Sequence, residues 1–268
     1  MDIKVVVRGG GDIASGVINR LYKMGVKVLV LEIEKPNFIR RKVCYGQAIY
    51  DKEYELEEAV SKFAENIEDI EKIWNEDKIP VYIDPEMKVV DIIKPDAVVD
   101  AIIAKKNLGL KVSKDYITIA LGPGFKAGKD ADVVIETNRG HNLGRVIFEG
   151  KAAENTGVPG VINGFGRERV VYAPEKGILT IIKDIGSIVK KDEIIAYVDN
   201  DPVYATLSGL VRGMIRDKSL VTKGLKIGDI DPRESEYENC FTISDKARTV
   251  SGGVAEALFY LLCKKGKI

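Results

Sequence analysis

The chain has 268 residues, of which 45% are hydrophobic, and its 41 Lys and Arg residues equal its 41 Asp and Glu residues. This balance, with no block of basic residues, argues against nucleic acid or an anionic membrane surface as a partner. No apolar run approaches the roughly 18 to 20 residues that a membrane span needs. The three cysteines have no C-x-x-C spacing, which argues against a disulfide framework or a zinc site. We therefore expect a folded cytoplasmic protein with one large or two ordinary domains.

Residues 3–31 read as a buried strand, a glycine turn, an amphipathic helix and a second buried strand. The turn places Gly9, Gly11 and Ala14 at the G-x-G-x-x-G/A positions of a dinucleotide-binding unit. Glu32 ends the second strand, where an acidic residue accepts a hydrogen bond from a ribose hydroxyl and disfavours a 2′-phosphate. The motif predicts a site for NAD or another adenine nucleotide.

Two interpretations of the glycine turn remain open. In the first, backbone N–H groups of the turn and of the helix start bind a phosphate. In the second, the Asp12 carboxylate caps those N–H groups itself, or the glycines are purely steric and no nucleotide binds. The residues predicted to bind the cofactor in this region are Gly9, Gly10, Gly11, Asp12, Ile13, Ala14 and Glu32.

The next two segments carry less information about function. Residues 40–42 are three adjacent cations, for which we favour solvation over contact with phosphates. Residues 55–75 are expected to form one acidic amphipathic helix, because apolar side chains recur at spacings of four, three and four from Phe63 to Trp74. That helix would be structural.

Three further apolar runs begin at Ala97, Tyr116 and Asp132, and each ends abruptly in polar or glycine residues. Such runs are typical of strands buried on both faces of a parallel sheet. If these strands lie parallel to the first, their polar ends emerge beside the glycine turn, at the edge where open α/β sheets bind ligands. The candidate catalytic residues at this edge are Asp100, Glu136 and His141. The candidate cofactor-binding residues there are Lys105, Lys106, Gly122, Gly124, Asn138 and Arg139.

Each of these side chains has an alternative interpretation. His141 is the only histidine and lies in the polar turn 136–142, so it is a candidate for proton transfer or phosphate contact, or else an ordinary surface histidine. Lys105 and Lys106 would bind an anionic small molecule or be solvated. Asp100 would act as a base or as a helix cap.

The second half of the chain contains an internal repeat at an offset of 32 residues. Residues 172–178 align with 204–210, and 189–191 align with 221–223, each valine following its glycine by 12 residues. The pattern resembles the biotinyl/lipoyl barrel-sandwich hybrid, a small β sandwich with interlocked halves. The hairpin 198–202 between the halves has no lysine, so the resemblance implies the scaffold without a swinging arm. Its expected role is a docking surface or a lid.

We therefore predict an α/β protein with three parts. Residues 1–165 form a Rossmann-like ligand-binding domain, and residues 166–233 form a barrel-sandwich hybrid domain. Residues 234–268 form a C-terminal segment whose helix, with Val254 and Leu258 on one stripe, packs back on the first domain. Cys240 is expected to be a buried thiol rather than a reactive thiolate.

Six motifs together resemble the YqeB family over nearly the whole chain. They are GGGDIASG (9–16), DAIIAKKNLG (100–109), GPGF (122–125), ETNRGHNLGR (136–145), DIDPR (229–233) and SDK (244–246). That family is associated with selenium-dependent molybdenum hydroxylases. Its first domain is similar to the Rossmann domain of XdhC-type proteins, which bind molybdenum cofactor and deliver it to xanthine dehydrogenase-like enzymes. The resemblance implies a maturation or accessory protein with a molybdenum hydroxylase as its client, and it carries no catalytic assignment.

Three functions remain open at this point. The first is a maturation protein that holds an anionic molybdopterin-type or nucleotide-containing cofactor at the glycine edge. The second is an NAD-dependent oxidoreductase in which Asp100, Glu136 or His141 handles the proton. The third is a non-catalytic assembly adaptor whose sandwich domain binds the client. Whether the protein is an enzyme is left open by the sequence.

Overall fold

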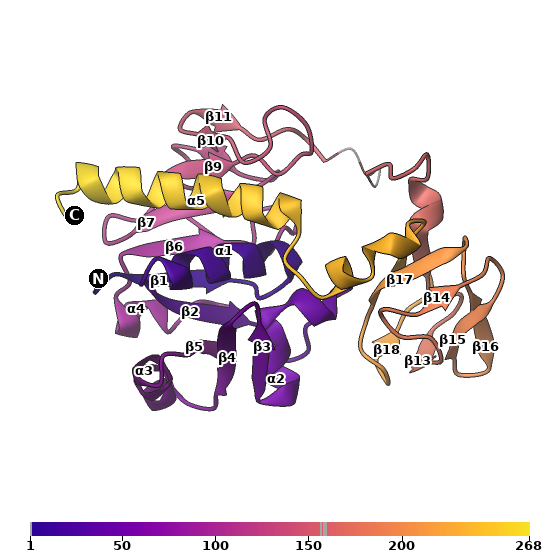
Figure 1. Ribbon diagram of the computed structural model, residues 1–268. Helices are drawn as coiled ribbons and strands as arrows, with labels where there is room; N and C mark the ends of the chain where they lie inside the picture. Colours follow the sequence, from indigo (N-terminus) through magenta and orange to yellow (C-terminus); the bar gives the residue numbers. More distant parts are fainter. Residues whose placement is uncertain (1, 156, 158–159) are drawn as a thin grey trace. The chain divides into compact units, whose positions relative to one another are not determined.

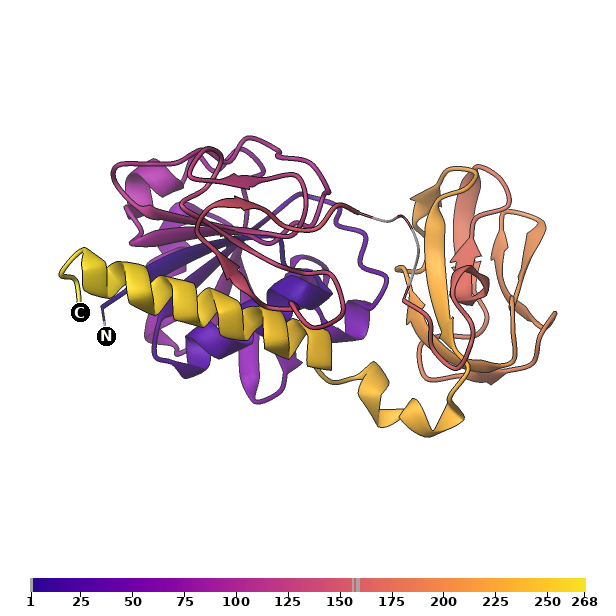
Figure 2. The ribbon, with the colours of Figure 1, turned by 90° about the horizontal axis from the view of Figure 1, so that it is seen from above.

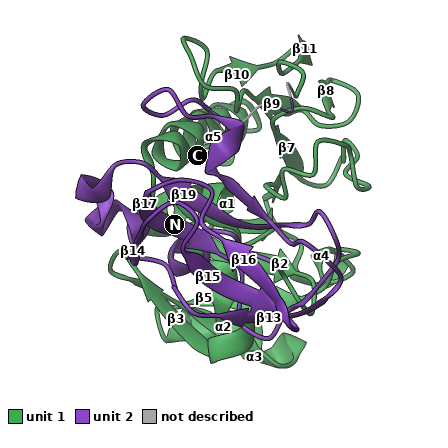
Figure 3. Cartoon of the chain, turned by 90° about the vertical axis from the view of Figure 1, so that its right-hand side faces the viewer, with its two compact units in different colours: residues 1–36, 44–156, 243–268 green, residues 37–43, 157–242 purple. Residues whose placement is uncertain are grey.

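The computed structural model describes residues 2–155, 157 and 160–268 (Figure 1). The chain divides into two compact units (Figure 3). Unit 1 comprises residues 1–36, 44–156 and 243–268, and unit 2 comprises residues 37–43 and 157–242. No helix in the described part of the chain has the length and apolar character that crossing a membrane requires.

Unit 1 is built on a nine-stranded sheet with the order β10-β9-β7-β6-β1-β2-β5-β4-β3. Strands β4, β5, β2, β1, β6, β7 and β9 are parallel, and the two edge strands are antiparallel to their neighbours. The order β5-β2-β1-β6-β7-β9 is that of a doubly wound Rossmann-like sheet, with its switch point between β1 and β6. The parallel directions that the argument from the sequence assumed are thus those of the structure. The strands are β1 (Lys4–Arg8), β2 (Lys27–Glu32), β3 (Glu53–Leu56), β4 (Ala59–Ala64), β5 (Ile79–Ile83), β6 (Ala97–Asp100), β7 (Ile117–Leu121), β9 (Val133–Ile135) and β10 (Val146–Ile147).

Helices cover both faces of this sheet because its apolar strands leave no polar face. Ile70 of α3 (Ile67–Asn75) and Val90 of α4 (Val90–Ile93) share a buried core with Val6 of β1. Because strand side chains alternate, the neighbouring residues of β1 face the opposite side. Figures 1 and 2 both show α5 (Asp245–Lys264) alongside α1 (Asp12–Lys23). The C-terminal helix thus belongs to unit 1, whereas residues 234–242 of the expected C-terminal segment belong to unit 2.

Residues 55–75 do not form one helix, so that prediction is wrong for its first half. Glu57 and Glu58 both adopt positive φ, 47° and 69°, and they form the turn of the β3–β4 hairpin. Only 67–75 is helical, and the Asn66 side chain caps it by accepting a hydrogen bond from the Asp69 N–H. The apolar spacing predicted the helix of residues 67–75 correctly. It does not distinguish that helix from the strand that precedes it, residues 59–64.

The cations of residues 40–42 are also placed differently from the solvated arrangement that we favour from the sequence. Arg40 is buried in unit 2 and donates hydrogen bonds to the carbonyls of Asn239 (2.9 Å) and Thr242 (3.2 Å). Arg41 is mostly buried and forms an ion pair with Asp184. Residues 37–43 therefore belong structurally to the second half of the chain.

Unit 2 contains two four-stranded antiparallel sheets, β12-β19-β17-β14 and β16-β15-β13-β18. A shift of 32 residues carries β12, β13, β14 and β15 onto β16, β17, β18 and β19, and it exchanges the two sheets. The buried core repeats in the same way, as Leu179 with Val211 and Ile195 with Ile227 illustrate. The internal repeat of the sequence is therefore a repeat of structure. The strands are β12 (Val170–Tyr172), β13 (Gly177–Ile181), β14 (Ile188–Val189), β15 (Ile194–Val198), β16 (Asp201–Tyr204), β17 (Gly209–Met214), β18 (Leu220–Val221) and β19 (Lys226–Asp231).

Short elements complete the fold. Cys240 lies in one of them and is buried, and burial raises the pKa of its thiol, in agreement with an unreactive cysteine. The elements are η1 (Arg41–Val43), η2 (Tyr45–Gln47), α2 (Ala48–Asp51), β8 (Lys126–Ala127), β11 (Gly150–Lys151), η3 (Arg167–Arg169), η4 (Glu234–Glu236) and η5 (Glu238–Cys240).

Candidate functional site

The segments that follow four parallel strands lie against one another at the carboxyl edge of the sheet. A Cβ added at Gly9 would lie 3.2 Å from the Ile102 Cα, and one added at Gly124 would lie 2.6 Å from the Lys106 Cα. A Cβ at Gly122 would lie 2.5 Å from the Thr137 hydroxyl oxygen. The close packing of these glycines brings the segments after β1, β6, β7 and β9 together, as the edge argument from the sequence requires.

A buried ion pair occupies the switch point between β1 and β6. The Arg8 guanidinium lies 2.6 Å from the Asp100 carboxylate, and it also donates to the carbonyls of Pro85 (3.3 Å) and Leu108 (3.2 Å). Burial raises the pKa of Asp100, while Arg8 opposes that shift. Asp100 also accepts from the Ile102 N–H at 3.3 Å. These contacts are typical of a structural ion pair that connects β1 to β6 and to the neighbouring loops. The role of Asp100 as a base stays a prediction.

The glycine turn is filled by residues of the chain itself. The Gly10 N–H donates to one Glu32 carboxylate oxygen at 2.8 Å, and the Ile33 N–H donates to the other at 2.9 Å. The Gly46 N–H donates to the Gly10 carbonyl at 3.0 Å. A Cβ added at Gly10 would lie 2.6 Å from the Gly46 Cα. Glu32 is thus engaged by backbone donors, and burial raises its pKa.

The segment that carries Gly46 is a fixed part of unit 1. Tyr45 is fully buried, and its N–H donates to the Ser15 hydroxyl of α1 at 2.9 Å. The Tyr45 hydroxyl donates to the Leu56 carbonyl (2.6 Å) and accepts from the Asn19 amide (2.8 Å). Since buried polar groups with complete hydrogen bonds are costly to displace, this segment is not a movable flap.

We predict that Gly10→Ala lowers the free energy of unfolding by about 1–3 kcal/mol, because its new Cβ forces two backbone segments apart. Chemical denaturation measures the change. Gly252→Ala is the matched control, since it adds a methyl group in open space within α5 and raises helix propensity. Equal stability of Gly10→Ala and the wild type would show that the turn is open rather than filled.

Lys246 is a basic side chain at the edge that sequence reasoning did not select. It is the second residue of α5 and is half-buried, and burial lowers its pKa, followed by the nearby charge of Arg139. The carboxylates of Asp12, Glu136 and Asp245 act in the opposite direction. Charged groups of three segments therefore act on this lysine: the start of α1, the loop after β9 and the start of α5.

The start of α1 has a glycine at its N-cap position. The N-cap residue is Gly11, which has no side chain to accept from the first-turn N–H groups of the helix. Such N–H groups carry the positive end of the helix dipole. Asp12 lies in the same turn and within electrostatic range of Lys246. The predicted cofactor-binding residues Ile13 and Ala14 follow in that turn.

The Glu136 carboxylate accepts hydrogen bonds from backbone N–H groups of the segment that follows β9. Glu136 is buried, and its two oxygens accept from the N–H groups of Asn138 and Ala153, both at 2.7 Å. Arg139 is exposed and forms two hydrogen bonds with Asp245, at 2.9 and 3.2 Å. The side chains of Asn138 and His141 are exposed. The catalytic roles predicted for Glu136 and His141 stay predictions.

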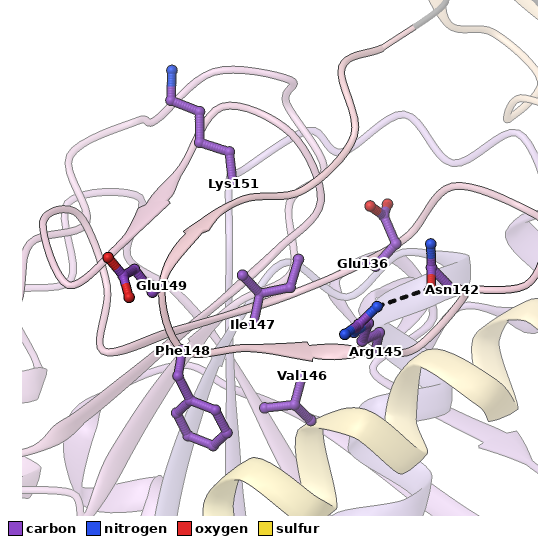
Figure 4. Close-up of a pocket in the computed structure, with 8 residues that line it drawn as sticks. All are labelled: Glu136, Asn142, Arg145, Val146, Ile147, Phe148, Glu149 and Lys151. Atoms are coloured by element: carbon purple, nitrogen blue, oxygen red, sulfur yellow. Dashed lines mark hydrogen bonds between the residues drawn. The ribbon is translucent and has the colours of Figure 1, made fainter.

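A cavity of about 380 Å³ lies beside this loop (Figure 4). Glu136 and Asn142 lie at one end of it, and Figure 4 shows Phe148 and Val146 on the side nearer α5. The cavity is therefore polar at the end near the edge and apolar along β10. Its lining residues are Glu136, Asn142, Arg145, Val146, Ile147, Phe148, Glu149 and Lys151.

Lys105 and Lys106 lie in the loop after β6, and both are exposed. Asn107 shapes this loop by accepting from the N–H groups of Gly109 and Leu110, both at 2.8 Å. Because Gly124 packs on Lys106, the two lysines have a defined place at the edge. A signal for Lys246 was present in the sequence, in the motif 244–246, whose serine caps α5.

No protein-family model matches the chain. The chain is 49% identical over 258 residues to "Uncharacterized protein YqeB" of Escherichia coli strain K12, a match that covers 96% of this chain and 48% of that protein. The chain thus spans about half the length of its curated relative. Two solved structures are similar only at low TM-scores, 0.23 and 0.26, with 10% identity each, and these scores carry no argument. They are product-bound EutE (DoeB) from Ruegeria pomeroyi, covering 76% of this chain and 57% of that one, and an aspartoacylase family protein from Mesorhizobium loti, covering 85% and 84%. On the sequence match, the chain belongs to the YqeB family.

Proposed function

We propose that this protein is an accessory protein of a selenium-dependent molybdenum hydroxylase system, and that it holds a phosphate-bearing molybdopterin-type cofactor at the carboxyl edge of unit 1. The observation that carries the proposal is the meeting of three segments at the start of α5. Arg139 of the loop after β9 donates to Asp245 at 2.9 Å, and a Cβ added at Gly16 of α1 would lie 2.6 Å from the Ala247 carbonyl oxygen. The chain belongs to the YqeB family, and the choice of system follows from what the resemblance to that family implies.

The charged groups at this edge would suit a ligand that carries a phosphate at one end and hydrogen-bond donors at the other. Lys246, Lys105 and Lys106 are cations that would bind phosphate, together with first-turn N–H groups of α1. The carboxylates of Asp12 and Glu136 would accept from ring N–H and amino groups, since an ionised carboxylate has further lone pairs beyond those already used. A pterin or nucleotide cofactor carries both kinds of group.

The glycine turn itself does not fit a dinucleotide. The Gly46 segment packs on Gly10, where an added Cβ would lie 2.6 Å from the Gly46 Cα, and this contact restricts the approach of a ligand to the turn. A Rossmann dinucleotide needs close approach to the backbone of this turn. The geometry therefore favours the cofactor-holding function over an NAD-dependent oxidoreductase, and we assign no catalytic step to Asp100, Glu136 or His141.

We infer that unit 2 is a barrel-sandwich hybrid that serves as a client-docking module. The interlocked halves of the 32-residue repeat support this assignment. The hairpin 198–202 between the halves has no lysine for a covalent carrier arm. An adaptor role for this unit is compatible with cofactor binding in unit 1.

Lys246→Met is predicted to weaken binding of a molybdopterin-type cofactor at least tenfold, because it removes a partly desolvated positive charge facing the phosphate. Lys264→Met, at the opposite end of the same helix, is the control and should leave affinity unchanged. Equilibrium titration monitored by pterin fluorescence measures both variants. Unchanged affinity in Lys246→Met, with a folded protein, would contradict the proposed site.

The same lysine predicts a pH dependence. Burial lowers the pKa of Lys246, so its ammonium form is lost at a lower pH than that of a surface lysine. Cofactor affinity should therefore fall as the pH rises through that lowered pKa, at a lower pH than an ordinary lysine would give. Lys246→Met should remove this dependence, whereas persistence of the same profile in the variant would assign it to another group.

A further inference from the structure

The cavity of about 380 Å³ beside β10 has the volume of a small-molecule site, since ligand pockets in proteins commonly measure roughly 300–1,000 Å³. Its lining comes from residues 145–149, Lys151, Glu136 and Asn142, all in unit 1 (Figure 4). Apolar side chains of β10 lie next to charged groups of both signs. Pockets that bind organic molecules combine apolar walls with a few polar groups in this way. The cavity is therefore a candidate site for a polar organic ring.

Glu136 is the buried charged side chain of this lining, with 6% of its surface exposed. Each of its two carboxylate oxygens accepts one backbone N–H at 2.7 Å, from Asn138 and from Ala153. A carboxylate offers about four lone-pair positions, so each oxygen can accept a second hydrogen bond. The two backbone donors also fix the orientation of the carboxylate. Glu136 therefore presents two adjacent acceptors at a fixed place in the cavity wall.

The loop that carries Glu136 is closed by its own backbone and packs on α5. The Glu136 N–H donates to the Arg145 carbonyl at 3.0 Å, and the Gly144 N–H donates to the Glu136 carbonyl at 2.9 Å. A Cβ added at Gly253 of α5 would lie 2.1 Å from the Gly144 carbonyl oxygen. Because these contacts hold the cavity wall, a ligand would bind it with little loss of loop entropy.

Two adjacent acceptors pair with two adjacent donors on a ligand. Guanine and pterin rings carry such a pair, a ring N–H beside an exocyclic amino group, whereas adenine has an acceptor nitrogen beside its amino group. We propose that this cavity binds the ring of a guanine nucleotide or of a pterin, with the Glu136 carboxylate as the acceptor of both donors. Arg145, which lines the same cavity, would stack its planar guanidinium on the ring.

This inference rests on the proposed function, because it assigns the ring of the proposed cofactor to the cavity and its phosphate to Lys246. The two places belong to neighbouring segments. Arg139, in the loop that begins at Glu136, donates to Asp245 at 2.9 Å, and Asp245 precedes Lys246 in the chain. The ring and the phosphate of one cofactor would thus contact the same loop and the same helix start.

Calorimetric titration of the full chain with small probes tests the cavity separately from the whole cofactor. Pterin should bind at least about tenfold more tightly than lumazine, which has a carbonyl group in place of the amino group, because an unpaired acceptor then faces the carboxylate. Guanosine monophosphate should likewise bind more tightly than adenosine monophosphate. The tighter of pterin and the guanine nucleotide identifies the source of the ring. Equal affinities within each pair, or no binding of any probe at about millimolar concentration, would overturn the proposal.

Variants of the cavity wall locate the bound ring. Glu136→Gln should weaken binding of the pterin probe at least about tenfold, because an amide N–H₂ replaces one acceptor. Glu154→Gln, an exposed carboxylate outside the cavity lining, is the matched control and should leave the affinity unchanged. Arg145→Ala removes an exposed side chain and keeps both backbone hydrogen bonds of Glu136, and it should weaken binding about fivefold through lost stacking.

Thermal unfolding checks that each variant is folded. If folded Glu136→Gln and Arg145→Ala both bind the pterin probe as the wild type does, the cavity does not hold the ring and the inference fails. The proposed function fails separately, when Lys246→Met leaves the affinity for the whole cofactor unchanged.

Discussion

Replacing Arg8 by alanine should lower the free energy of unfolding by about 3–5 kcal/mol, because it leaves the Asp100 carboxylate buried without its partner. The guanidinium also ties β1 and β6 to the carbonyls of Pro85 and Leu108. Burial already raises the pKa of Asp100, so the orphaned carboxyl in the variant should take up a proton more readily. The deficit measured by urea denaturation should therefore shrink as the pH is lowered.

Two comparisons separate this effect from a general loss of charge. Lys88→Ala removes an ion pair with Glu86 in which both side chains are exposed, and it should cost less than about 1 kcal/mol. The double variant with leucine at positions 8 and 100 should recover much of the stability, since it buries no unpaired charge. A cost below about 1 kcal/mol for Arg8→Ala would mean that the switch point is hydrated rather than sealed.

Asp231→Asn should destabilise unit 2 by a similar amount, about 3–5 kcal/mol. The Asp231 carboxylate is fully buried and accepts hydrogen bonds from Arg212 (2.8 Å) and Arg233 (2.8 and 2.9 Å). An asparagine removes the carboxylate charge that faces both guanidinium groups, although Arg233 retains its ion pair with Glu236 at 3.5 Å. Hydrogen exchange read out by mass spectrometry should show faster exchange in β17 and β19, and the exposed Asp201→Asn should show none. Unchanged protection of β17 and β19 in Asp231→Asn would contradict a stabilising role for the Asp231 carboxylate.

Lowering the pH should remove part of the same stabilisation from the wild-type protein. Burial raises the pKa of Asp231, but hydrogen bonds from Arg233 and Arg212 outweigh it and lower the pKa to about 2. A carboxylate with a depressed pKa stabilises the folded state above the unfolded pKa, near 4, and this contribution is lost as the pH falls towards 2. The contribution is on the order of 2 kcal/mol at neutral pH. Asp231→Asn should be less sensitive to this acid range.

The local pattern of the sequence predicted unit 1 well where side-chain periodicity is strong. The run 3–31 gave the correct strand, turn, helix and strand, and the three apolar runs after residue 96 are parallel strands as expected. The hairpin of β3 and β4 was missed because its turn uses Glu57 and Glu58 at positive φ. Those residues are rare in such turns, which usually contain glycine or asparagine.

The candidate site was predictable only in part, because its contacts join segments far apart in the chain. The edge itself followed from the parallel strands. Neither the packing of Gly46 on Gly10 nor the position of Lys246 near Glu136 is encoded in local spacing. Glu32 illustrates the consequence, since the motif assigns it to a ribose hydroxyl, whereas its carboxylate binds the glycine turn.

A competitive titration of the wild-type protein with a molybdopterin-type cofactor, NAD and adenine nucleotides, read by native mass spectrometry, tests the proposed cofactor site directly. The molybdopterin species should bind with 1:1 stoichiometry and at least tenfold more tightly than NAD, because Gly46 packs on Gly10 of the glycine turn. Tight binding of NAD, with no binding of the pterin, would contradict it and would restore the oxidoreductase interpretation.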